Sequence, residues 1–185
     1  MINNEKTKGF TMAEVLVSVA IFSLLSVVLA NIFVSSIKAQ SKILQNQDIM
    51  EESNYALEYM GKALRMAKKD TDGYCTGGSN YQWDWTWIEF LSYDSVDGDY
   101  KCRVFAFEDD TIREYRSEDN TSSFGVPADI ISSKIKVNSL YFYVTGDVSG
   151  GQPKTTIMLD LEGANSSGSK MVIQTTISQR ELNID

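Results

Sequence analysis

The feature that most constrains this sequence is a predominantly apolar run from Phe10 to Ile37, in which Glu14 is the only ionisable side chain. About 20 apolar residues are enough to cross the hydrocarbon core of a bilayer as a helix. The run follows a short polar leader that carries Lys6 and Lys8. The sequence therefore predicts one membrane-spanning helix over residues 10–37, with the leader, residues 1–9, at its cytoplasmic end.

The helix is expected to continue beyond the membrane, because neither glycine nor proline occurs from Phe10 to Met60. Residues 38–69 form its amphipathic outer half. Their apolar stripe recurs every seven residues, at Ile43, Met50, Leu57 and Leu64, and is flanked by Ala56, Met60, Ala63 and Ala67. Such a stripe can pack on a sheet of the same chain or form a coiled coil, and the small number of repeats favours the sheet.

Residues 70–185 contain strand-like runs separated by turn residues and are expected to form an exported β-rich domain. The predicted strands cover 83–93, 101–108, 111–115, 139–145, 155–161 and 171–178. The main turns are predicted at 97–99, 108–110, 146–153 and 163–168. The fold class is α+β: one long N-terminal α-helix, whose outer half packs on a C-terminal antiparallel β-sheet.

The charge and composition argue against several functions. The formal net charge of −8 disfavours direct contact with nucleic-acid phosphates. The chain has no histidine, which removes the commonest general base and the commonest zinc ligand, and it has no GxSxG nucleophile motif. We therefore expect no enzymatic activity, no catalytic residues, no cofactor and no metal site.

Two cysteines, Cys75 and Cys102, lack the paired spacing of a redox or metal motif. If the domain is exported, a disulfide between them is the simplest interpretation, and closing this loop would stabilise the fold by about 3 to 4 kcal/mol. Two buried free thiols are the alternative.

The junction between the leader and the apolar run carries the most specific pattern. It reads Lys8-Gly9-Phe10-Thr11-Met12-Ala13-Glu14. This order and spacing closely resemble the prepilin signal of type IV pilins and type II secretion pseudopilins, and the close resemblance covers about the first 30 residues. An ordinary secretory signal would instead have a shorter apolar stretch that precedes the cleavage site.

The resemblance implies how the chain would be processed. A membrane prepilin peptidase would cut between Gly9 and Phe10 and methylate the new amine of Phe10. Glu14 would then serve subunit assembly by pairing with the terminal amine of a neighbouring subunit. A carboxylate within a membrane segment costs about 3 kcal/mol and is generally retained for a partner. The alternatives are pairing with the amine of the same chain and a position among the lipid headgroups.

The resemblance also implies partners and location. The partners would be the prepilin peptidase, other pilin or pseudopilin subunits, an inner-membrane assembly platform and membrane lipid. The chain would cross the inner (cytoplasmic) membrane once, with the C-terminal domain extracytoplasmic, and would join a periplasmic or extracellular filament after assembly. Pilins often carry a helix-breaking proline midway along the filament-core helix, and its absence here favours a minor pseudopilin.

Two other patterns suggest ligands. Trp83, Trp85 and Trp87 alternate within one predicted strand. Such a row could form a platform on which sugars or bases stack, or it could pack against Leu57, Met60 and Leu64 of the helix, which we favour. A membrane-anchored binding module for glycan or another ligand is thus the alternative function. The carboxylates of Asp94, Asp97 and Asp99 could bind calcium, although turns use the same residues.

Overall fold

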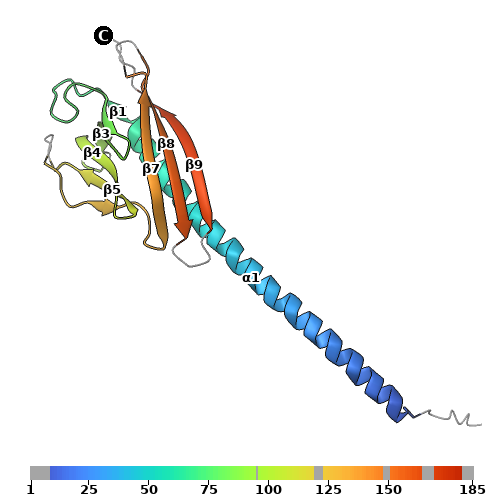
Figure 1. The fold of residues 1–185 in the computed structure, drawn as a ribbon. Coiled ribbons are helices and arrows are strands. Elements are labelled where there is room, and N and C mark those ends of the chain that lie inside the picture. Colours follow the sequence, from blue (N-terminus) through green and yellow to red (C-terminus); the bar gives the residue numbers. More distant parts are fainter. Residues whose placement is uncertain (1–8, 95, 119–122, 148–150, 164–168, 181–185) are drawn as a thin grey trace, which may run out of the picture. The chain divides into compact units, whose positions relative to one another are not determined.

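The computed structural model describes residues 9–94, 96–118, 123–147, 151–163 and 169–180. The chain divides into two compact units, residues 1–44 and residues 45–185. The elements are α1 (Met12–Arg65), β1 (Ala67–Lys68), β2 (Tyr81–Asp84), β3 (Trp87–Asp94), β4 (Asp99–Glu108), β5 (Thr111–Arg116), β6 (Ala128–Asp129), β7 (Ile135–Thr145), β8 (Lys154–Gly163) and β9 (Lys170–Ser178) (Figure 1).

Helix α1 starts and ends slightly inside the predicted range of residues 10–69. It starts at Met12, and the Thr11 hydroxyl caps it by accepting the Glu14 N–H, one of the backbone donors without a partner in the first turn. It ends at Arg65, and the chain then turns into β1, which pairs with Leu91 and Ser92 of β3. Lys62 and Arg65 lie in the last turn, where cations interact favourably with the helix dipole.

The larger sheet of the second unit is antiparallel, with the order β1-β3-β4-β5-β6, and β2 also pairs with β3. The tight turn between β4 and β5 uses Asp109 and Asp110, both with positive φ, as a two-residue hairpin turn requires. The predicted strand over residues 83–93 is wrong in one respect, because β2 folds back on β3 through a turn at Trp85 and Thr86. The Asp84 carboxylate accepts a hydrogen bond from the Trp85 N–H (2.7 Å) and stabilises this turn.

Because of this turn, the three tryptophans do not form the predicted row on one strand. Trp83 lies on β2 and Trp87 on β3, so the three indoles do not alternate along one strand. Trp83 is half-buried and packs against the hydrophobic core, whereas Trp85 is 57% exposed. The expectation that the whole row faces the core is therefore wrong for Trp85.

The smaller sheet has the order β7-β8-β9 and is also antiparallel. The predicted single sheet is thus divided in two. The pairing of β7 with β8 shifts at Asn138, where a bulge occurs between Val137 and Ser139. Most of the turn predicted over residues 163–168 lies outside the described residues.

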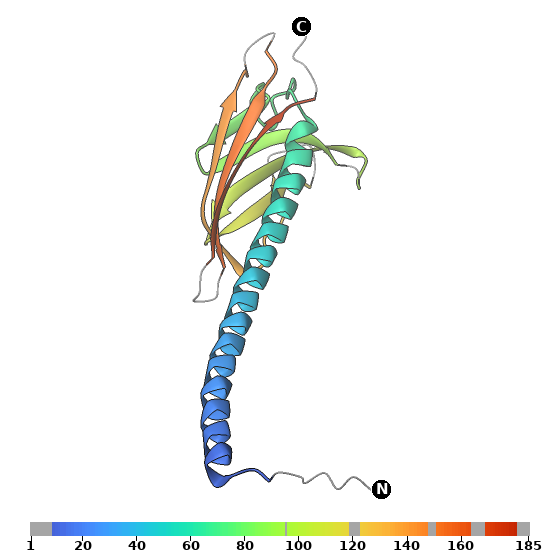
Figure 2. The same cartoon turned by 90° about the vertical axis from the view of Figure 1, so that its right-hand side faces the viewer.

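The upper part of α1 runs alongside both sheets (Figures 1 and 2). One hydrophobic core joins the two sheets to residues 49–64 of this helix. Large buried side chains come from α1, the larger sheet and the smaller sheet: Ile49, Met60, Leu64, Phe90, Phe105, Phe142 and Leu159. The prediction that the outer half of the helix packs on the β-rich domain is confirmed.

The buried face of α1 matches the predicted stripe in part: Leu64 and the predicted flanking residues Ala56, Met60 and Ala63 are buried, as is Ala67 in β1. The predicted residues Ile43 and Met50 are 55% and 56% exposed, and Leu57 is only partly buried. Ile49, Ala56 and Ala63 lie one residue before predicted positions of the repeat. The whole buried face includes several small side chains: Ile49, Ser53, Ala56, Met60, Gly61, Ala63 and Leu64. Small residues let the helix backbone lie close to the strands, so that a Cβ on Gly61 would approach Ile177 Cδ1 to 3.2 Å.

Candidate processing and assembly site

The junction before α1 is an exposed, non-helical segment. Gly9, Phe10 and Thr11 precede the helix, and Phe10 is 87% exposed. A Cβ built on Gly9 would meet nothing within 4 Å, so the chain itself sets no steric demand for glycine there. The peptide bond between Gly9 and Phe10 is therefore accessible to an external protein, and any need for a small residue at position 9 comes from that protein.

Thr11 and Glu14 form a capping box at the start of α1. The backbone N–H of Thr11 donates to Glu14 Oε2 (2.8 Å), and the Thr11 hydroxyl donates to the same oxygen (3.0 Å). In return, the Glu14 N–H donates to Thr11 Oγ1 (3.3 Å). These bonds satisfy backbone donors that lack partners within the helix. Glu14 thus has a local role at the helix start in the unprocessed chain.

The first unit presents a predominantly apolar surface from Met12 to Ile37, where Glu14 is the only charged side chain. From Met12 to Leu44 every side chain is exposed, and α1 is long and apolar enough to cross a membrane by its length and composition. The hydroxyls of Ser18, Ser23 and Ser26 donate to the carbonyls four residues earlier, at 2.8 Å each. Because these polar groups are satisfied inside the helix, they do not prevent its surface from facing lipid or other helices.

The comparisons agree with this arrangement. Residues 5–30 match the family model of the prokaryotic N-terminal methylation motif. No curated protein and no solved structure matches the chain. Residues 5–30 therefore carry a type IV prepilin-like signal, and the long helix packed against antiparallel sheets is consistent with a pilin-like fold.

The motif supports a processed subunit of the type IV pilin or pseudopilin type, which is a structural class rather than an enzyme class. It implies processing by a prepilin peptidase and assembly with other pilins, and with the apolar helix it indicates membrane anchoring. The cleavage bond, the methylation of Phe10 and the assembly role of Glu14 remain predictions.

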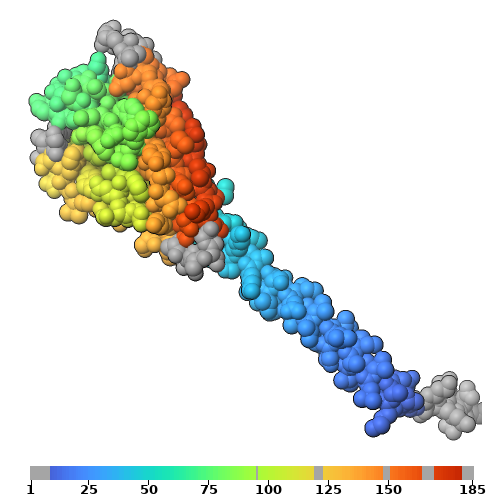
Figure 3. Space-filling model, viewed as in Figure 1, coloured from blue at the N-terminus to red at the C-terminus, as the bar shows by residue number. Residues whose placement is uncertain are grey.

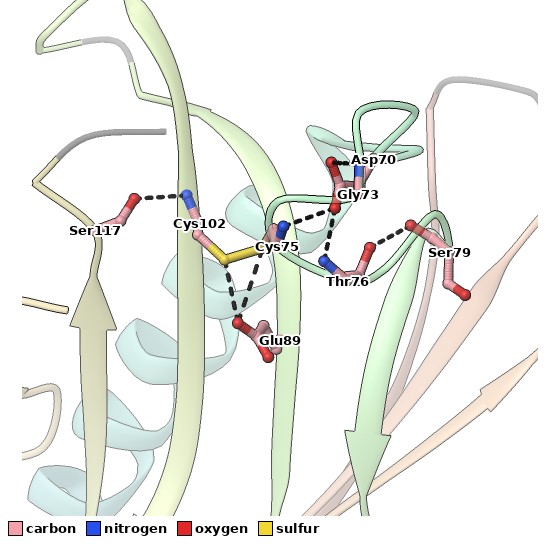
Figure 4. Close-up of a disulfide and its surroundings, with 8 residues drawn as sticks. All are labelled: Asp70, Gly73, Cys75, Thr76, Ser79, Glu89, Cys102 and Ser117. Carbon is pink, nitrogen blue, oxygen red and sulfur yellow. Dashed lines mark hydrogen bonds between the residues drawn. A yellow bond between two sulfur atoms is a disulfide. The ribbon is translucent and has the colours of Figure 1, made fainter. Parts of the chain in front are cut away.

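The two cysteines, far apart in the sequence, meet in the second unit (Figure 4). Cys75 and Cys102 form a disulfide with a Cα–Cα distance of 5.6 Å. The buried carboxylate of Asp70 fixes the loop that carries Cys75, because it accepts hydrogen bonds from the N–H groups of Cys75 and Thr76, both at 2.7 Å, and of Gly73 at 3.1 Å. A turn-forming aspartate between the helix and the strands gives no local signal for this anchoring role, because it depends on how the loop folds back on Asp70.

Glu89 of β3 lies against the disulfide, with its Oε1 atom 3.2 Å from Cys102 Sγ. Burial raises the pKa of Glu89, and the nearby negative charge of Asp70 raises it further. The two sulfur atoms and this carboxylate are close enough to hold a metal ion. However, both sulfur atoms are bonded to each other, and a disulfide offers no thiolate ligand.

A buried ionic network joins α1 to the larger sheet. Arg103 of β4 and Glu114 of β5 form an ion pair with almost no exposed side-chain surface. The Tyr59 hydroxyl of α1 donates to Glu114 Oε2 (2.6 Å) and accepts from Arg103 Nη2 (3.0 Å). Arg116 reaches Glu114 Oε2 (3.1 Å) and Asp94 Oδ2 (3.2 Å). These contacts orient the helix on the sheet. The sequence spacing does not reveal them, because the residues that bind one another are far apart along the chain.

The three candidate calcium ligands have separate local roles. Asp94 is buried, accepts the Val96 N–H (2.9 Å) and pairs with Arg116. Asp97 pairs with Lys101, and Asp99 accepts the N–H of Tyr100 (2.7 Å). The hydrogen bond from the Val96 N–H and the charge of Arg116 outweigh the opposing effect of burial and hold the pKa of Asp94 below its ordinary value. These contacts favour a turn and ion-pair role for the carboxylates.

Proposed function

We propose that this chain is a minor subunit of a type IV pilus or of a type II secretion or competence pseudopilus, assembled through its N-terminal helix. The observation that carries the proposal is the prokaryotic N-terminal methylation motif at residues 5–30. The absence of proline from residues 10–60 favours a minor subunit over the main filament subunit. The chain would be anchored in the inner membrane by a single span, with the β-rich domain outside the cytoplasm.

The first step is hydrolysis of the peptide bond between Gly9 and Phe10 by a prepilin peptidase. The products are a leader that ends in the Gly9 carboxylate and a mature chain that starts with the Phe10 amine, which is then methylated. The exposed, non-helical conformation of residues 9–11 supports this step, because a protease must bind its substrate in an accessible extended form.

The second step is recognition of Glu14 by an ammonium group. Within the described residues, both hydrogen bonds that the Glu14 carboxylate accepts end on Oε2, which leaves Oε1 for a cation. Processing creates such a cation at Phe10. Inside a membrane the pair is strongly favoured over an isolated carboxylate. Pairing with the amine of a neighbouring subunit would fix the axial position of each new subunit.

Processing is tested by co-expression with a prepilin peptidase, followed by N-terminal sequencing and intact mass measurement. A mature chain that starts at a methylated Phe10 is expected, and Gly9→Ala should reduce its formation. An uncut chain that still starts at Met1, in cells where the peptidase cleaves another prepilin, would contradict the proposal. A membrane-anchored binding module would then become the favoured function.

Assembly is tested with Glu14→Gln, using Glu51→Gln as a matched control on an exposed part of the same helix. Glu14→Gln should be cleaved normally but should fail to crosslink with other pilin subunits in the membrane, whereas Glu51→Gln should do both. Normal crosslinking of Glu14→Gln would contradict the pairing step while leaving the processing step intact.

A further inference from the structure

An aromatic platform lies on the second unit, where the turn between β2 and β3 meets the outward face of β7 and β8. We define it by four side chains: Trp85, Tyr141, Tyr143 and Met158, which are 57%, 45%, 48% and 43% exposed. Their neighbours on the opposite face of the sheet, such as Phe142 and Ile157, are fully buried. The described parts of these strands form a broad continuous surface (orange to red in Figure 3).

The rings of the platform are held in fixed positions. Trp85 and Tyr143 lie nearly parallel, with an angle of 15° between their planes and 6.2 Å between their centroids. Trp83 meets both rings edge-on, at 5.8 Å each, and is itself packed on the core. The Phe142 N–H donates to the Trp85 carbonyl (2.9 Å) and so ties the turn to β7. A platform fixed in this way loses little conformational entropy when it binds a ligand.

A hollow of about 300 Å³ accompanies the platform, near the lower limit for small-molecule sites. Its lining residues are Trp85, Tyr141, Phe142, Tyr143, Thr156 and Met158. None of these described lining residues carries a charge. Polar groups come instead from the tyrosine and threonine hydroxyls, and Thr156 pairs with Thr176 of β9 through their hydroxyls (2.9 Å).

The chemistry of this lining selects among ligands. Nucleic acid also stacks on aromatic rings, but it requires nearby cations for its phosphates, and this hollow is uncharged in a chain of net charge −8. A neutral sugar ring combines an apolar C–H face, which suits the electron-rich face of an aromatic ring, with hydroxyls that suit a rim of hydroxyl groups. We propose that the aromatic platform is a binding site for a hexopyranose unit of a neutral glycan.

The proposal does not depend on processing at Gly9 and is tested separately. The full chain is placed in nanodiscs, since maltoside detergents themselves contain sugar. Cellotetraose, chitotetraose, maltotetraose and a galactotetraose serve as probes in saturation-transfer NMR and titration calorimetry. At least one probe should bind, and saturation should pass from the protein's aromatic protons to C–H protons of a sugar ring.

Substitutions test whether the oligosaccharide binds at the aromatic platform. Trp85→Ala and Tyr143→Ala should each weaken binding about tenfold. Trp85→Phe and Tyr143→Phe keep a ring and should retain part of the affinity, so a folding defect is distinguished from a lost contact. Tyr74→Ala, an exposed tyrosine outside the platform, should bind like the unchanged chain.

Three results would overturn the proposal. The first is that none of the four oligosaccharides binds. The second is that both alanine variants bind a probe as tightly as the unchanged chain does. The third is that the platform variants instead weaken binding of a thymidine oligonucleotide or self-association of the chain, which would assign the platform to a different kind of partner.

Discussion

Glu114 and Glu89 are two carboxylates on neighbouring parts of the same sheet whose surroundings act on them in opposite directions. Burial opposes ionisation of Glu114, but Arg116, Arg103 and Tyr59 outweigh it and lower the pKa of its carboxyl. Burial and the negative charge of Asp70 raise the pKa of the Glu89 carboxyl. One carboxylate therefore favours the folded state when it is ionised, and the other opposes it.

Glu114→Gln should destabilise the second unit by about 3 kcal/mol at neutral pH, because it leaves the charge of Arg103 buried without its partner. Urea unfolding is followed by tryptophan fluorescence, since all three tryptophans lie in this unit. Glu58→Gln, at an exposed position of α1, is the control and should change the free energy of unfolding by less than about 0.5 kcal/mol. Equal effects of the two variants would contradict a structural role for the buried pair.

The same network predicts acid sensitivity. The folded pKa of Glu114 lies below its ordinary value of 4.5, so its stabilisation is complete above that pH and is lost as the pH falls through the folded pKa. The destabilising effect of Glu114→Gln should therefore shrink as the pH is lowered below about 4.5. A pH-independent difference between the variant and the unchanged chain would contradict this assignment.

Glu89→Gln should change the stability of the second unit in the opposite direction. The folded pKa of Glu89 lies above 4.5, so at neutral pH the folded state carries the cost of an ionised, half-buried carboxylate. The variant should be more stable than the unchanged chain at pH 7, and the gain should disappear below about pH 4.5, where the glutamate is neutral in both states. Thermal unfolding measured across this pH range checks the sign, and a loss of stability at pH 7 would contradict it.

At the scale of elements, α1 serves two surroundings with one continuous helix. Residues 12–44 are exposed and predominantly apolar as far as Ile37, whereas residues 49–64 bury a stripe of large and small side chains against both sheets. One unbroken helix can serve both surroundings. A membrane-spanning part requires only a largely apolar composition, whereas a part that packs on sheets requires apolar side chains on one particular face.

The register of that face is testable with two neighbouring residues. Ile49→Ala should destabilise the second unit by about 2 to 5 kcal/mol, because Ile49 is 1% exposed and a cavity would form. Met50→Ala should change stability by less than about 0.5 kcal/mol, since Met50 is 56% exposed. The seven-residue stripe that the sequence suggested predicts the reverse order, so urea unfolding of the two variants distinguishes the two registers.

At the scale of the whole molecule, the chain combines a unit that has an exposed apolar helix surface with a unit that has its own core. Core substitutions should therefore change the stability of the second unit, while substitutions in the first should not. Leu25→Ala, at a residue 56% exposed, should leave the tryptophan-monitored unfolding unchanged within about 0.5 kcal/mol. A loss comparable to that of Ile49→Ala would show that the two units unfold together.

Much of the architecture could be predicted from local patterns. The helix, the turn at Asp109 and Asp110, and most strands follow from hydrophobic periodicity and turn residues, because these depend on neighbours in the sequence. The errors have the same origin. A row of alternating tryptophans predicts one strand, yet the Trp85–Thr86 turn divides it, and only the pairing of β2 with β3 decides that.

The prepilin-like signal at residues 5–30 was determined by the sequence alone, because it is a contiguous pattern of neighbouring residues that depends on no tertiary contact. Tertiary structure decided what depends on distant contacts. It separated the strands into two sheets, selected Ile49 rather than Met50 for the core, and joined Tyr59 to Arg103 and Glu114. It also brought Trp85 beside Tyr143, since packing places side chains together that sequence separation keeps apart.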